Sequence, residues 1–210
     1  MDGLLIDSET VYQAGMINAA VAMGYELPPE LFRRLVGLAG PESQSVMRGH
    51  YGEDFPLADY NRTADVEINK LLVAGVVLKT GVLELLDHLE AMELPRAVAT
   101  STSRRWAERH LGQTGIRDRF HAVVTRDDVE RAKPSPDLFL KAASLIGADP
   151  AHCLALEDSH NGVRAAHAAG MMTVMVPDLL EPTDEMHGKC VHIAQDLHRV
   201  LDLVRASQDR

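Results

Sequence analysis

Two adjacent acidic residues, Glu157 and Asp158, follow the apolar run 154–156. Carboxylates at the end of a buried strand repel each other, and burial increases the free-energy cost of their charges. A divalent cation relieves that cost, and oxygen ligands that leave room for water and phosphate suit Mg²⁺. The alternative is structural: Asp158 or Ser159 caps the next helix and Glu157 is exposed. These residues alone leave both interpretations open.

Hydroxyl side chains follow a second predicted strand. The run Val98–Thr100 leads into Ser101, Thr102 and Ser103, and a helix is predicted to begin near Arg104. Hydroxyl and backbone N–H donors at the amino end of a helix form an anion site. Ser101 or Ser103 could also cap the helix, and capping and anion binding can coexist.

A lysine lies in the run Lys133-Pro134-Ser135-Pro136-Asp137. Pro134 favours an extended backbone at Lys133, and Pro136 suits the first turn of the next helix. A lone lysine is usually exposed, but one fixed beside two prolines is better positioned than a free surface lysine.

The fourth signal is at the amino end, where Asp2-Gly3 precedes Asp7-Ser8. On its own, Asp2-Gly3 favours a turn and Asp7-Ser8 the cap of the following helix. The other three signals make a chemical role for Asp2 the better interpretation.

Composition excludes several function classes. A formal net charge of −10 argues against a general nucleic-acid binder. Two cysteines are too few for a disulfide framework, and the acidic amino end lacks the basic segment of a secretory signal, so a cytoplasmic protein is expected. The longest apolar stretch, 71–86, is interrupted by polar residues and predicts no membrane span. The histidines lack the paired spacing of a zinc site.

The pattern of apolar residues divides the chain into two parts. Residues 10–77 read as helices, with breaks expected at Gly24, Gly37 and Gly40-Pro41. From Gly81 onward, short apolar strands alternate with amphipathic helices. Strands are predicted at 96–100, 122–125, 153–156 and 172–176, and helices at 82–92, 104–114, 136–146, 161–169 and 194–204. This α/β pattern predicts a doubly wound parallel sheet, whose active sites collect at the carboxyl ends of the strands.

Taken in order, the four signals resemble the four motifs of the haloacid dehalogenase (HAD) superfamily. The resemblance covers the whole chain and includes the stretch Asn161-Gly162-Val163, which continues to Ala169-Gly170. It is highly specific for the superfamily and weak for substrate. Within the superfamily the chain resembles the subgroup with a small helical cap, which includes sugar-phosphate and nucleotide phosphatases and β-phosphoglucomutase. It implies a Rossmann-like core at 1–9 and 78–210 with an inserted α-helical cap domain at 10–77.

The resemblance also implies roles for these residues. Asp2 would protonate the leaving oxygen and later deprotonate a water. Ser101 with the N–H of Thr102, together with Lys133, would hold the phosphate. Mg²⁺ would be held by the backbone carbonyl of Asp2 and by Asp158.

Three further residues are implied at the same site. Glu157 would lie close to the metal. Gly37 would lie where the cap approaches the substrate, and Arg104 is a further candidate for contact with it. The expected partner is a small phosphomonoester, and the expected oligomeric state is a monomer or weak dimer.

One part of the family pattern falls outside the chain. The first HAD motif reads Asp-x-Asp-Gly and its first Asp is the nucleophile, whereas here Met1 falls on x and Asp2 on the second acid. We therefore expect the nucleophile directly before Met1, at the end of a central strand whose absence leaves an apolar gap between its neighbours. The favoured explanation is that the start of the protein has been placed too late by roughly ten residues, the length of a strand and its approach. The alternatives are an inactive remnant and a phospho-ligand binder. The chain as given is expected to be inactive.

Two departures from the subgroup favour hydrolysis over mutase chemistry. Mutases carry a His where this chain has Tyr12, and a cap Arg where it has Gly40. Asp2 in turn favours phosphate chemistry over dehalogenation. Sugar phosphates are the expected substrate class, followed by nucleotide or pseudouridine monophosphates.

Overall fold

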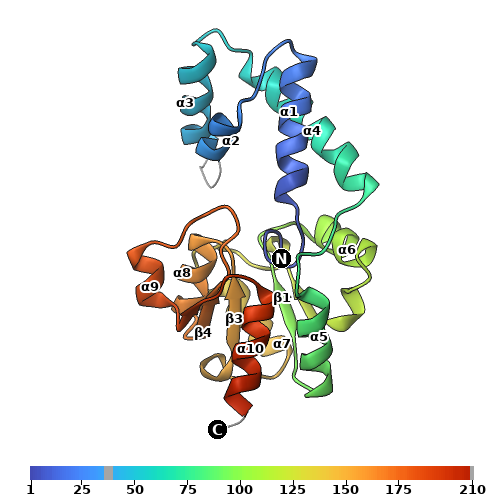
Figure 1. Ribbon diagram of the computed structural model, residues 1–210, viewed down its shortest axis with the longest axis vertical. Helices are drawn as coiled ribbons and strands as arrows, with labels where there is room; N and C mark the ends of the chain where they lie inside the picture. The colour runs from blue at the N-terminus through green and yellow to red at the C-terminus, as the bar shows by residue number, and fades with distance from the viewer. Residues whose placement is uncertain (36–39, 209–210) are drawn as a thin grey trace. The chain divides into compact units, whose positions relative to one another are not determined.

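The computed structural model describes residues 1–35 and 40–208. The chain forms two compact units (Figure 1). The core unit comprises Met1–Asp7 and Val77–Arg210, and the cap unit comprises Ser8–Val76. Within the described residues, none of the helices has both the length and the apolar character needed to cross a membrane.

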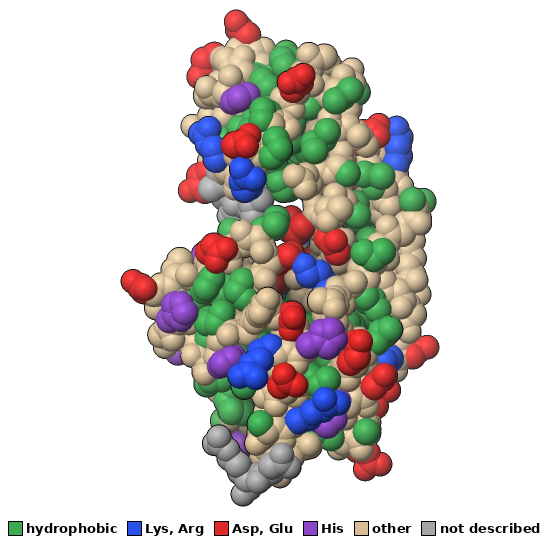
Figure 2. All heavy atoms as spheres, in the orientation of Figure 1, with side chains coloured by type: hydrophobic (Ala, Val, Ile, Leu, Met, Phe, Trp, Pro, Cys, Tyr) green, Lys and Arg blue, Asp and Glu red, His purple; other side chains and the backbone are tan. Residues whose placement is uncertain are grey.

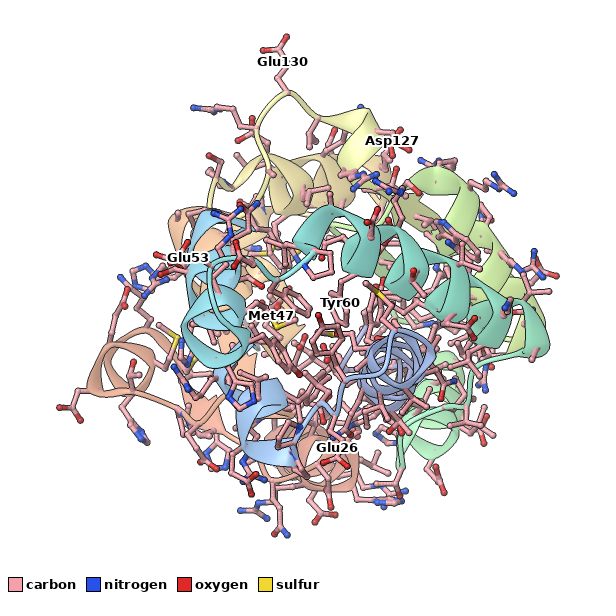
Figure 3. The ribbon with its side chains drawn as sticks, turned by 90° about the horizontal axis from the view of Figure 1, so that it is seen from above. Glu26, Met47, Glu53, Tyr60, Asp127 and Glu130 are labelled. Atoms are coloured by element: carbon pink, nitrogen blue, oxygen red, sulfur yellow. The ribbon has the colours of Figure 1, made fainter. Side chains whose placement is uncertain are left out.

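The described part of the cap unit is entirely helical, as predicted. Its helices are α1 (Glu9–Ala22), α2 (Pro29–Leu35), α3 (Gly40–Tyr51) and α4 (Leu57–Ala74). Helices α1 and α4 pack closely because Gly15 has no side chain, and a Cβ there would overlap the side chain and backbone of Ile68. Met47 and Tyr60 lie between the helices and are almost fully buried (Figure 3). Of the predicted break at Gly37 and Gly40-Pro41, Gly37 lies outside the described residues, and Gly40 is the residue at which α3 begins.

The core unit shows the predicted alternation of helices and strands. Its strands are β1 (Ala97–Ala99), β2 (Ala122–Val124), β3 (Leu154–Glu157), β4 (Met172–Met175) and β5 (His192–Ile193). Its α-helices are α5 (Val82–Ala91), α6 (Arg104–Gln113), α7 (Asp137–Leu145), α8 (His160–Ala168), α9 (Asp184–Lys189) and α10 (Leu197–Gln208). Short 3-10 helices lie at Arg117–Arg119, Arg126–Asp128 and Pro150–His152. The sequence did not predict β5 and α9, which are too short to show a periodic pattern.

The strands are parallel, as predicted, and they form two sheets. One sheet pairs β1 with β2, and the other has the order β3-β4-β5. Lys133 donates hydrogen bonds to the carbonyl of Ala99, at the end of β1, and to Glu157, at the end of β3. The carboxyl ends of β1 and β3 therefore lie at the same edge of the core. The two strands therefore run in the same direction without pairing with each other.

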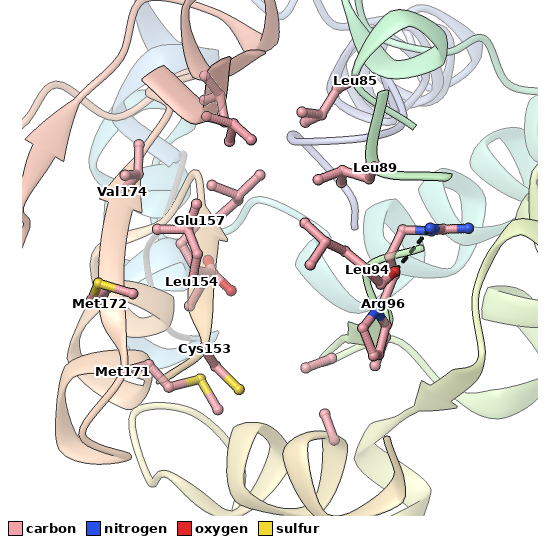
Figure 4. A pocket seen from close by; sticks show the side chains of 18 of the residues that line it. Leu85, Leu89, Leu94, Arg96, Cys153, Leu154, Glu157, Met171, Met172 and Val174 are labelled. Carbon is pink, nitrogen blue, oxygen red and sulfur yellow. Dashed lines mark hydrogen bonds between the residues drawn. The ribbon is translucent and has the colours of Figure 1, made fainter. Parts of the chain in front are cut away.

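A cavity of about 760 Å³ separates β1 from β3. We call it the strand slot. It is bounded by β1 and β3 and by helices α5, α7 and α10, and its lining includes Leu85, Leu89, Val98, Phe139, Leu156 and Leu203. In Figure 4, Leu85 and Leu89 lie across the slot from Leu154. An apolar gap between two strand edges, expected from the sequence, is therefore present.

Charged side chains of the core unit pair across elements. Arg119 donates hydrogen bonds to Asp87 at 2.6 Å and to Glu90 at 2.7 Å, both on α5. On the face drawn in Figure 2, Lys and Arg side chains lie among Asp and Glu side chains. Exposed pairs of this kind contribute little to stability, so the apolar packing and the strands define the core.

The strand slot gives a first prediction. We expect the free energy of unfolding to rise by about 2–5 kcal/mol when about five Val and Ile residues are added before Met1. The reason is that the free energy gained by burying the added side chains in the slot exceeds the entropic cost of ordering them. Met1 lines the slot, so the added segment starts at its edge. Urea unfolding measures the difference, and a Gly/Ser segment of the same length is the control. Equal stability of the two extended proteins would contradict this use of the slot.

Candidate active site

Asp2 lies beside the loop that follows β1. The backbone turns sharply after Met1, whose carbonyl accepts hydrogen bonds from Leu5 at 2.8 Å and Ile6 at 3.1 Å. The turn directs Asp2 toward Thr102, whose hydroxyl donates a 2.6 Å hydrogen bond to Asp2 Oδ2. Two signals that are far apart in the sequence therefore meet at the carboxyl edge of β1.

The loop between β1 and α6 has its own internal hydrogen bonds. The N–H of Thr102, a predicted phosphate donor, donates to the hydroxyl of Thr100 at 3.1 Å. Ser101 is exposed at the end of the strand. Ser103, the residue before α6, makes no side-chain cap, and the N–H of Arg104 donates to Asp127 instead. The exposed hydroxyl of Ser101 is therefore accessible to a ligand.

Lys133 joins the two sheets at this edge. Its side chain is 9% exposed, and its Nζ donates to the carbonyl of Ala99 at 3.0 Å and to Glu157 Oε1. The ammonium group also lies 4.9 Å from the centre of the Phe139 ring, a distance typical of a cation–π contact. These contacts fix Lys133 between β1 and β3, and they explain why the residue is buried.

Glu157 is buried, contrary to the alternative in which it is exposed. Its Oε2 accepts a 3.1 Å hydrogen bond from the hydroxyl of Ser159, which itself accepts the N–H of Gly162 and so caps α8. A Cβ on Gly162 would overlap the Glu157 carboxylate. Burial opposes ionisation of Glu157, but the charge and hydrogen bond of Lys133 outweigh it and lower the pKa. Glu157 is therefore an ionised partner of Lys133, and both of its oxygens are engaged.

Asp158 lies beside the Asp2-Gly3 turn. Gly3 has a φ of +72°, and a Cβ there would overlap Asp158 Oδ2 and lie 3.3 Å from Asp178 Oδ2. Burial, and next the negative charge of Glu157, raise the pKa of Asp158 to about 7. Asp178 is held by a 2.5 Å ion pair with Lys79, and its Oδ2 is buried without a hydrogen-bond partner. Negative charge therefore accumulates around Gly3.

This set of donors fits a hard divalent cation. Three carboxylates lie at or near the carboxyl ends of β3 and β4, and a buried oxygen of Asp178 lacks a donor. Among the described residues, no three acidic, histidine or cysteine side chains lie close enough to hold a metal ion by themselves. A cation here would need a backbone carbonyl, water or phosphate as well, which is how Mg²⁺ is usually held.

Arg104, a predicted substrate contact, is bonded to protein acceptors. Its guanidinium donates to Glu108, to Asp128 and to the carbonyl of Val123. Gly37 lies outside the described residues.

Three nearby residues were missed by the sequence analysis. Asp178 follows β4, so the rule that polar residues gather at strand ends could have found it. Lys79, its partner, precedes α5 and carried no motif. His110 is a buried residue in the middle of α6, 3.9 Å from Asp2, and nothing in the sequence pattern distinguishes it from a packed core residue.

The raised pKa of Asp158 predicts a pH-dependent effect of Asp158→Asn. Because the folded state holds this proton more tightly than the unfolded state, wild-type stability should be lost as pH rises from about 4 to about 7. Without divalent cations, the variant should match the wild type at pH 4 and exceed it at pH 8 by up to about 4 kcal/mol, measured by urea unfolding.

Asp65→Asn, which changes an exposed residue on α4, is the matched control. Mg²⁺ should stabilise the wild type at pH 8, because the ion would neutralise the buried carboxylate of Asp158. It should leave Asp158→Asn unaffected, because that variant has no charge at this position. A constant difference between variant and wild type from pH 4 to pH 8 would contradict the assignment.

Comparison with known proteins places these observations in a family. The model of the haloacid dehalogenase-like hydrolases matches residues 1–176. The chain is 32% identical to YhcW of Bacillus subtilis (strain 168) over 183 residues, which cover 87% of this chain and 83% of YhcW. It is 36% identical to the "Probable pseudouridine-5'-phosphatase" of Drosophila melanogaster over 186 residues, with coverages of 85% and 79%.

A solved structure shows the same arrangement. A CbbY mutant from Rhodobacter sphaeroides in complex with xylulose-(1,5)bisphosphate superimposes with a TM-score of 0.71 at 26% identity, covering 94% of this chain and 92% of that protein. The chain therefore belongs to the haloacid dehalogenase-like hydrolases, and it is similar to CbbY proteins within that family.

Proposed function

We propose that this protein is a Mg²⁺-dependent phosphomonoester hydrolase that acts through an aspartyl-phosphate. The observation that carries the proposal is the meeting of four sequence signals at one edge of the core. Asp2 bonds to Thr102, Lys133 spans the ends of β1 and β3, and Asp158 lies against Gly3.

We place the nucleophile on an aspartate joined to the amino group of Met1. The positive charge of that amino group adds to the effect of Lys133 on Glu157, and it opposes the rise in the pKa of Asp158. Met1 also lines the strand slot. A residue attached there would stand beside Lys133 and Asp158, at the carboxyl end of a segment that fills the slot.

The residues divide the chemistry among them. The aspartate would attack phosphorus, and Lys133 and Ser101 would stabilise negative charge on the transferred group. Asp2 would protonate the leaving oxygen and then take a proton from the water that hydrolyses the intermediate. Asp158 and the backbone carbonyl of Asp2 would hold Mg²⁺, which supplies positive charge that neutralises the phosphate.

The similar proteins support a small phosphorylated metabolite as substrate. One carries the name of a pseudouridine-5'-phosphatase, and another was crystallised with a sugar bisphosphate. Sugar phosphates are the first class to examine and nucleotide-like monophosphates the second. Tyr12 and Gly40, at positions where mutases carry His and Arg, favour hydrolysis over mutase action.

A phosphate-release assay tests the proposal on three proteins. The first is residues 1–210, and the other two carry an apolar segment before Met1 that ends in Asp or in Asn. We expect Mg²⁺-dependent turnover only from the protein with Asp, because only it has the nucleophile. Asp158→Asn in that protein should abolish turnover.

Each result has a defined meaning. Rapid Mg²⁺-dependent turnover by residues 1–210 would refute the placement of the nucleophile. No turnover by the Asp protein on sugar phosphates, nucleotides or p-nitrophenyl phosphate would refute the hydrolase itself. In that case, binding of inorganic phosphate would favour a phospho-ligand binder.

A further inference from the structure

His110 is a buried histidine to which the proposed mechanism gives no role. It lies on α6 with 2% of its surface exposed, and its Nδ1 is 3.9 Å from Asp2 Oδ1. Among the residues that the structure describes, neither ring nitrogen has a hydrogen-bond partner, although both are buried. The ring centre of Trp106 lies 5.5 Å from that of His110. Two unpaired ring nitrogens in a buried site are costly unless one of them serves a neighbouring group.

Asp2 presents an acceptor 3.9 Å from the ring, a distance longer than a hydrogen bond but short enough for an electrostatic contact. Its Oδ2 already accepts the hydroxyl of Thr102 at 2.6 Å, whereas Oδ1 faces the imidazole. A neutral imidazole has one N–H donor and one lone pair. A carboxylate needs the donor, which places the proton on Nδ1.

We propose that His110 is a positioning residue for Asp2, with its Nδ1–H directed at Oδ1 while Thr102 holds Oδ2. The significance for catalysis rests on the proposed function, but the contact itself does not. A carboxyl group anchored at both oxygens by different partners cannot rotate freely. Loss of one anchor would leave the proposed acid and base able to turn away from the leaving oxygen.

The first experiment uses residues 1–210 and needs no activity. Nitrogen-15 NMR of the histidine side chains reports which ring nitrogen carries the proton, and His110→Asn assigns the signal. We expect the Nδ1–H form in the wild type and the intrinsically favoured Nε2–H form in Asp2→Ala. An Nε2–H ring in the wild type, or an Nδ1–H ring that persists in Asp2→Ala, would overturn the proposal.

The second experiment uses the extended protein with Asp before Met1. General acid catalysis contributes about 10²–10⁴-fold to a rate, so loss of one anchor should cost part of it. With phenyl phosphate, whose leaving group needs a proton, we expect His110→Gln and His110→Leu to lower kcat/KM about tenfold, within that range. With p-nitrophenyl phosphate, whose leaving group departs without a proton, kcat/KM should change little, because this ratio reports the transfer to the nucleophile and not the later step in which Asp2 acts as a base.

Two further variants separate positioning from packing. His110→Asn should keep most of the rate, because its amide N–H lies near the position of Nδ1. Leu111→Met, a change at a buried neighbour on α6, is the packing control and should affect both substrates equally. Equal losses with both substrates in the His110 variants, or no rescue by Asn, would overturn the proposal. If the extended wild-type protein releases no phosphate, the proposed function fails and the NMR result alone decides whether His110 holds Asp2.

Discussion

The buried ion pair between Lys133 and Glu157 is the interaction on which the carboxyl edge of the core depends. Both side chains are almost fully buried, so each charge needs the other. Lys133 reaches the end of β1 through the carbonyl of Ala99, and Glu157 is the last residue of β3. The pair therefore joins two sheets whose strands do not pair with each other. It keeps the carboxyl ends of β1 and β3 close together, and the other polar residues of the site lie beside these ends.

The same pair sets the electrostatics of the neighbouring carboxylate. Lys133 compensates Glu157 directly, but Asp158 is left beside a negative charge and in a largely buried position. A site of this kind favours a proton at low pH and a cation at higher pH, because both supply the missing positive charge. The two carboxylates at the end of β3 have different roles because of their positions. Glu157 has both oxygens engaged by Lys133 and Ser159, whereas Asp158, like Asp178, faces the Gly3 turn.

The general layout was predictable from the sequence because parallel strands bring their carboxyl ends to one edge. This rule placed Ser101, Lys133 and Asp158 correctly relative to the strands and predicted the alternation of elements. It did not reveal that the N–H of Thr102 donates to the hydroxyl of Thr100. Nor did it reveal that the guanidinium of Arg104 donates to the carbonyl of Val123 on β2 and to Asp128 in the following loop. Such choices depend on which polar group is nearest in space, and the sequence does not contain that information. His110 was missed for a related reason, because a histidine on a helix has no pattern that marks the residue it faces.

The strand slot and the candidate site are consequences of one geometry. The slot lies between β1 and β3, and the polar residues lie where those two strands end, so a strand placed in the slot would also end among them. Its side chains would fill an apolar cavity, its backbone would pair with both exposed strand edges, and its last residue would enter the field of Lys133 and Asp158. Stability and chemistry would thus depend on the same few residues. A segment that fits the slot but ends in an uncharged residue would restore the fold without the reaction, which separates the structural contribution of that strand from its chemical one.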